Sequence, residues 1–170
     1  ISSSIKESSK SLFSAGFVLI FTIPLVRVMI NSGVNSYDIV SMPIAMAEGI
    51  ANFFGGIYPL FAPTIGAIGA FIAGSNTVSN LMLSQFQFET AKILGLSGAL
   101  MVALQSVGAA AGNMIAIHNV VAASATVGLI NREGDVIRIT IIPLLYYLFL
   151  SGTIGILVFY VFKVPDPLIF

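Results

Sequence analysis

Cysteine and tryptophan are absent from this sequence, histidine occurs once, and charged residues make up only 8% of the chain. Without cysteine the chain has no disulfide framework, no thiolate metal site and no cysteine nucleophile. One histidine leaves too few ligands for a zinc site, so no metal and no cofactor is expected. Seven Lys and Arg residues balance seven Asp and Glu residues. No basic excess is present to bind a phosphate backbone, which excludes a nucleic-acid partner.

Hydrophobic residues make up 57% of the chain, against about 45–50% in soluble proteins. The charges are also segregated, because residues 49–88, 93–131 and 139–162 contain none. About 20 helical residues cross a bilayer core. The composition therefore predicts an all-α fold, a polytopic transmembrane helix bundle. The chain begins at Ile1 without a signal-peptide pattern, so we expect a piece of a longer protein.

The apolar segments predict three membrane spans within a single membrane domain, 1–170. They cover about 11–30, 95–130 and 137–162. The middle span is expected to break near Gly112 and Asn113. Gly108 and Gly112 also form a Gly-x-x-x-Gly pair, which permits close helix approach.

The uncharged stretch 49–88 does not fit one straight helix, which would be about 60 Å long at about 1.5 Å per residue. A polar break at 74–80 interrupts it, and the arm that follows is too polar to cross a bilayer. We therefore predict a re-entrant hairpin over about 56–92 with its tip at 74–80. Irregular backbone at membrane depth is tolerated only inside protein or beside a water-filled cavity.

The tip contains Ser75, Asn76 and Thr77, three short polar side chains halfway along an uncharged stretch. A helix N-terminus there adds free N–H groups and partial positive charge, which suit a carboxylate. Backbone carbonyls at the end of the first arm suit a cation instead, and broken helices mark the binding sites of transporters. The alternative is that Ser75 and Thr77 only cap the second arm.

Further polar side chains lie near the second break. Asn113 is a candidate partner for substrate, or else forms a hydrogen bond between helices. His118 is a candidate proton carrier because imidazole titrates near physiological pH, or else it is a neutral bundle residue. Asn119, which follows it, is a further candidate substrate contact. Glu48, on a predicted helix at 42–54, is the other candidate proton carrier, unless that helix only lines the surface.

Three ungapped stretches resemble the signature of the bacterial L-lactate permease family. They are 69–80 (Gly-Ala-Phe-Ile-Ala-Gly-Ser-Asn-Thr-Val-Ser-Asn), 103–114 (Ala-Leu-Gln-Ser-Val-Gly-Ala-Ala-Ala-Gly-Asn-Met) and 118–129 (His-Asn-Val-Val-Ala-Ala-Ser-Ala-Thr-Val-Gly-Leu). The resemblance covers about Pro43 to Tyr147. This part of the chain is similar to the C-terminal third of family members. The Ser-Asn-Thr tip also resembles the hairpin-tip motif of the wider ion-transporter superfamily, which implies substrate binding at Ser75, Asn76 and Thr77, with Asn113 as their partner.

The resemblance implies part of a secondary transporter that takes up L-lactate, and often glycolate, by proton symport across the bacterial inner membrane. The expected partners are a small monocarboxylate, protons, the lipid bilayer and the missing N-terminal portion. Two alternatives stay open: a sodium-coupled carboxylate carrier and a non-transporting membrane packing module. An enzyme is not expected, because no nucleophile–base pair, phosphate loop or dinucleotide motif is present.

Overall fold

The structure is a computed structural model that describes residues 9, 20–21, 23–129 and 131–166. These residues form helices and no strand, which confirms the predicted all-α fold class. Half of the predicted span 11–30, residues 11–19 and 22, lies outside the described residues. Within that span, residues 23–30 are helical and lead into the short 3₁₀ helix η1 (Asn31–Gly33).

Helix α2 (Met42–Phe54) begins after an extended Ser41 and carries Pro43 in its first turn, where the missing N–H costs no helical hydrogen bond. It ends at Gly55, whose φ of 52° is in the left-handed range that favours glycine. The 3₁₀ helix η2 (Gly55–Leu60) continues the chain. Together α2 and η2 meet the next helix at 98°, so they turn the chain sharply before the hairpin.

Helices α3 (Ala62–Ala73) and α4 (Asn76–Ile93) form a hairpin whose connection is only Gly74 and Ser75. Gly74 has φ +69° and donates its N–H to the carbonyl of Ala70 at 2.7 Å. Ser75 is extended, and its Oγ accepts from the N–H of Val78 at 3.4 Å. The tip is therefore shorter than the predicted 74–80, because the short polar residues after Ser75 start a helix instead of prolonging the loop.

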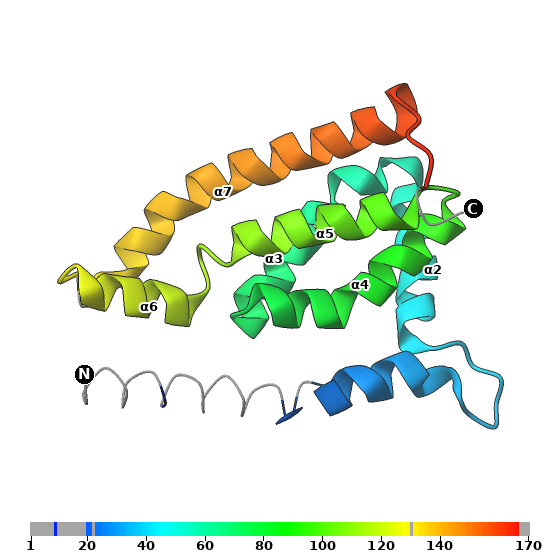
Figure 1. Ribbon diagram of the computed structural model, residues 1–170, viewed down its shortest axis with the longest axis horizontal. Coiled ribbons are helices and arrows are strands. Elements are labelled where there is room, and N and C mark those ends of the chain that lie inside the picture. The colour runs from blue at the N-terminus through cyan, green and yellow to red at the C-terminus, as the bar shows by residue number, and fades with distance from the viewer. Residues whose placement is uncertain (1–8, 10–19, 22, 130, 167–170) are drawn as a thin grey trace.

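Helix α5 (Gly98–Gly112) ends at the residue pair where the sequence predicts a break, and α6 (Ile117–Thr126) follows after residues 113–116. The axes of α5 and α6 differ by 43°. Helix α7 (Glu133–Ile156) and the π-helical turn η3 (Leu157–Val161) return along the molecule. Figure 1 shows α7 running beside α5, with α6 at the opposite end of the hairpin from α2.

Small residues bring α3 and α5 into close contact. A Cβ added at Gly108 would overlap the backbone carbonyl of Pro63, and one added at Gly112 would overlap that of Ala67. Gly66 meets the backbone of α5 at Gln105 in the same way. The close helix approach predicted from Gly108 and Gly112 is confirmed, and it fixes the hairpin against α5.

Among the described residues, one continuous helical segment, the 29 residues Glu133–Val161, is long and apolar enough to cross a membrane. Two bent pairs satisfy the same criterion if each is one span. These are Met42–Leu60 with Ala62–Ala73, and Gly98–Gly112 with Ile117–Thr126. The number of spans and the re-entrant course of the hairpin stay predictions.

Candidate functional site

The hairpin tip presents the N-terminus of α4. The first N–H groups of a helix have no carbonyl partner within it, and they carry partial positive charge. Ser75 and Asn76 are half-buried and Thr77 is exposed, so the tip borders the surface of the described chain. Ser75 does cap the helix, as the alternative interpretation holds, through a single hydrogen bond that its Oγ accepts. An anionic group of small size fits this combination of free N–H groups and hydroxyls.

Asn76 and Asn80 form a pair of amides one helical turn apart. The Nδ2 of Asn80 donates to the Oδ1 of Asn76 at 3.0 Å. The Oδ1 of Asn80 is buried and has no hydrogen-bond partner in the described part of the chain. A buried acceptor of this kind is uncommon in native proteins and costs free energy until a donor reaches it.

His118, near the start of α6, lies against the turn of the hairpin. A Cβ built on Gly74 would overlap the imidazole ring and would stand 2.8 Å from its Nε2. Only glycine therefore leaves room for the ring at this position. His118 itself is exposed. The structure thus brings together two regions that the sequence treated separately, the hairpin tip and the segment after the second break.

Asn119 bridges the break between α5 and α6. Its Nδ2 donates to the backbone carbonyl of Asn113 at 3.1 Å and to the Oδ1 of Asn113 at 2.9 Å. Both side chains are half-buried. The partner of the Asn113 amide is therefore its neighbour across the break, and the pair holds the start of α6 close to the end of α5.

Glu48 lies elsewhere. It is exposed on α2, which packs on α4 and η2. Figure 1 shows α2 at the far end of the hairpin from α6. The structure does not bring Glu48 to the tip or to His118.

A buried polar chain inside the bundle was not foreseen from the sequence. Tyr58 Oη donates to Gln87 Oε1 at 2.6 Å, and Gln87 Nε2 donates to Gln105 Oε1 at 2.9 Å. Gln105 Nε2 donates to Ser79 Oγ at 3.2 Å, and Ser79 Oγ donates to the carbonyl of Gly66 at 2.9 Å. All four side chains have no exposed surface. We call Tyr58, Ser79, Gln87 and Gln105 the interior network.

The interior network ties η2, α4 and α5 together. The available signal was Gln105, an amide within the uncharged stretch 93–131. The polarity of the second arm, including Gln87, indicated only that this arm does not cross the bilayer. A pairing between α4 and α5 requires the fold, because the two glutamines lie on different helices.

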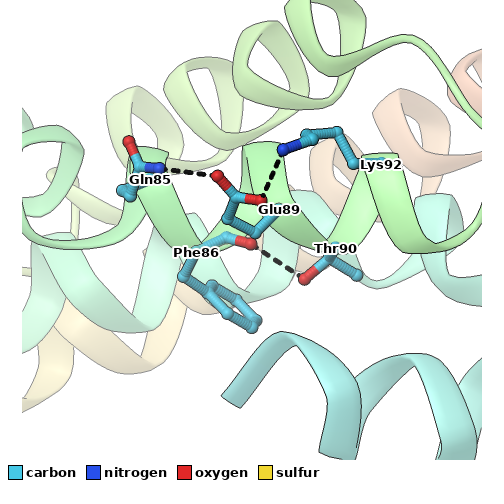
Figure 2. Close-up of polar contacts among 5 residues, drawn as sticks. All are labelled: Gln85, Phe86, Glu89, Thr90 and Lys92. Carbon is cyan, nitrogen blue, oxygen red and sulfur yellow. Dashed lines mark hydrogen bonds and ion pairs between the residues drawn. The ribbon is translucent and has the colours of Figure 1, made fainter. Parts of the chain in front are cut away.

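The C-terminal half of α4 carries a half-buried carboxylate, Glu89, which Figure 2 shows with its partners. Glu89 accepts from Gln85 Nε2 at 2.8 Å and from Lys92 Nζ at 3.1 Å. Thr90 Oγ1 donates to the carbonyl of Phe86 at 2.9 Å. The carboxylate of Glu89 is therefore neutralised locally. Among the described residues no three His, Asp or Glu side chains gather into a metal site.

Comparison with known proteins gives a consistent family. The family profile described as L-lactate permease matches residues 1–162. The chain is 41% identical over 141 residues to a putative L-lactate permease of Haemophilus influenzae, which covers 83% of this chain and 25% of that protein. It is 38% identical over 113 residues to the L-lactate permease of Bacillus subtilis, with 66% and 20% covered.

A glycolate permease of Escherichia coli is 34% identical over 108 residues, which cover 64% of this chain and 19% of that protein. No solved structure gives a significant match. The chain spans 25% of the length of the Haemophilus relative and 26% of that of the Salmonella typhi L-lactate permease. With a family profile that matches nearly its whole length, this chain belongs to the L-lactate permease family.

Proposed function

We propose that this chain is part of a secondary transporter that takes up L-lactate, with glycolate as a second substrate, by proton symport across the bacterial inner membrane. The names of the relatives support a transporter of small 2-hydroxy monocarboxylates. The lipid bilayer and the N-terminal portion of the transporter are the expected partners, because the relatives are about four times as long as the stretch they share with this chain.

The carboxylate of the substrate binds at the hairpin tip, to the N–H groups and side chains of Ser75, Asn76 and Thr77. Supporting this placement, α4 begins at the tip and offers unpaired N–H groups to an anion. Asn113 and Asn119 hold the neighbouring helix break and complete the polar lining. No enzyme chemistry is proposed.

The observation that carries the coupling proposal is the contact between His118 and Gly74. The contact supports the coupling proposal because an imidazole, a side chain able to take up and release a proton, lies against the turn of the hairpin. A protonated ring attracts a carboxylate, and a bound carboxylate favours the protonated ring. Each ligand then assists the other, with a coupling free energy of about 1–3 kcal/mol in typical cases.

The test is His118→Gln in the complete transporter, reconstituted in vesicles. Glutamine keeps a hydrogen-bonding side chain but does not titrate. Lactate exchange across the membrane is expected to continue, while accumulation driven by a pH gradient fails. Glu48→Gln is the matched control and is expected to retain accumulation.

Full pH-driven accumulation by the His118→Gln variant would assign the proton to another group, with Glu48 or the N-terminal portion next in line. Uptake that follows a sodium gradient instead of a pH gradient would favour the sodium-coupled alternative. Vesicles that show no lactate uptake with either gradient would favour the packing module.

A further inference from the structure

We propose that Asn80 is the residue that recognises the 2-hydroxyl group of the substrate, by accepting its hydrogen bond. The inference rests on the proposed function, because it takes the hairpin tip as the carboxylate site. It assigns a specific role to an asparagine that lies one helical turn beyond the Ser-Asn-Thr tip.

The hydrogen bond between the two amides decides which atoms stay available. Asn80 Nδ2 donates to Asn76 Oδ1 at 3.0 Å. These two atoms are therefore already engaged in a hydrogen bond with each other. This contact also fixes the orientation of the Asn80 amide, and its Oδ1 is left buried without a partner among the described residues. The Nδ2 of Asn76 makes no hydrogen bond in the described chain, so it remains a donor at the half-buried tip.

The amide pair therefore offers one donor and one acceptor. A carboxylate only accepts hydrogen bonds, whereas a hydroxyl group also donates. A 2-hydroxy monocarboxylate carries both groups on adjacent carbons, so its carboxylate suits Asn76 Nδ2 and its hydroxyl suits Asn80 Oδ1. Lactate and glycolate, the two acids in the names of the relatives, share this arrangement.

Burial of the Asn80 Oδ1 strengthens the preference for acids that carry the hydroxyl. A buried acceptor loses its hydration, so a ligand that lacks the hydroxyl leaves it unpaired, and sites built to bind a hydroxyl reject such analogues. Asn80 as a whole is only partly buried, and its amide contacts Asn76, the first residue of α4 at the tip. The interior network does not compete for the Oδ1 of Asn80. Its nearest member in the sequence, Ser79, is already hydrogen-bonded to Gly66 and Gln105.

The experiment compares acids in the complete transporter. Inhibition of labelled lactate uptake is measured with unlabelled lactate and with propionate, which lacks only the hydroxyl. The ratio of the two inhibition constants reports recognition of that group. Asn80→Leu is expected to lower the preference for lactate by about two- to tenfold, with propionate inhibition unchanged. Gln85→Leu, on the same helix, is the control and is expected to keep the wild-type ratio.

A second measurement needs no variant. In 2-fluoropropionate, fluorine replaces the hydroxyl at similar size but donates no hydrogen bond, so the wild type is expected to bind this acid as weakly as propionate. Binding as tight as that of lactate would overturn the acceptor role. Equal weakening of lactate and propionate by Asn80→Leu, or no weakening, would overturn the assignment to Asn80. Wild-type transporter that ignores lactate altogether would instead contradict the proposed function.

Discussion

The interior network and the hairpin tip are both polar regions of a very apolar chain. They differ in whether their buried polar groups are hydrogen-bonded. In the interior network Tyr58, Gln87 and their partners are fully buried, and every one is hydrogen-bonded within the chain. At the tip Asn76 is half-buried, and one buried acceptor of Asn80 has no partner in the described chain.

The difference separates structural polar groups from available ones. A satisfied network holds helices in register and leaves nothing for a ligand. An unpaired buried acceptor costs about 1–3 kcal/mol, which a ligand able to donate would recover. Polarity alone therefore does not identify the site. The pairing state of each group is more informative, and the unpaired oxygen of Asn80 supports the proposed site at the tip.

The largest effect is expected from Gly74→Ala at the tip, and Gly95→Ala provides the matched control. Both glycines have positive φ, +69° and +66°, so either alanine costs roughly 1–2 kcal/mol of backbone strain. Alanine at Gly74 must also displace the exposed ring of His118, which adds to this cost. Gly95 has nothing within 4 Å of the added Cβ. Thermal inactivation midpoints of the two variants measure the difference.

Lactate affinity is expected to fall in Gly74→Ala and to stay near wild type in Gly95→Ala. The double variant Gly74→Ala with His118→Ala is expected to recover the part of the stability loss that the ring causes. Equal destabilisation by the two single alanine variants would show that His118 does not pack on the turn. The account of the hairpin tip would then be wrong.

A smaller effect is expected from Gln105→Leu in the interior network. Leucine fills the space of the glutamine but leaves Gln87 and Ser79 with one hydrogen bond fewer each, at a cost of about 1–3 kcal/mol. Gln85→Leu is the control, since Gln85 is half-buried and lies outside the interior network, where its side chain donates a hydrogen bond to Glu89 (Figure 2). It is expected to leave the inactivation midpoint nearly unchanged.

The affinity of folded Gln105→Leu transporter for lactate is expected to equal that of the wild type. A lowered inactivation midpoint with unchanged affinity marks a structural role. If lactate affinity fell while the midpoint stayed the same, the interior network would belong to the binding site, and the division between the two regions would be wrong.

Much of the helical framework could be predicted from the sequence. The apolar stretches, the glycine at 74 and the pair Gly112–Asn113 indicated the hairpin turn and the end of α5, because glycine and short polar residues end helices. The length of the tip could not be predicted. Ser75, Asn76 and Thr77 favour turns and also favour helix starts, and only the cap from Ser75 to Val78 decides between the two.

The contacts between distant segments were beyond the sequence. His118 against Gly74 and Gln87 against Gln105 each join residues on different helices, and nothing in the periodicity of a single sequence pairs them. The candidate residues Ser75, Asn76, Thr77, Asn113, Asn119 and His118 were named from polarity at breaks. Asn80 was missed, because its importance lies in an unpaired oxygen that only the folded chain has.

The most direct measurement is substrate protection of cysteines at the two ends of the hairpin. In a cysteine-free transporter, Thr77→Cys introduces a cysteine at the tip, and Lys92→Cys introduces one at the opposite end of α4. Both native side chains are exposed. Lactate is expected to slow modification of the tip cysteine by a water-soluble thiol reagent and to leave the other unchanged. Equal protection of both cysteines, or protection of Lys92→Cys alone, would contradict the placement of the substrate at the tip.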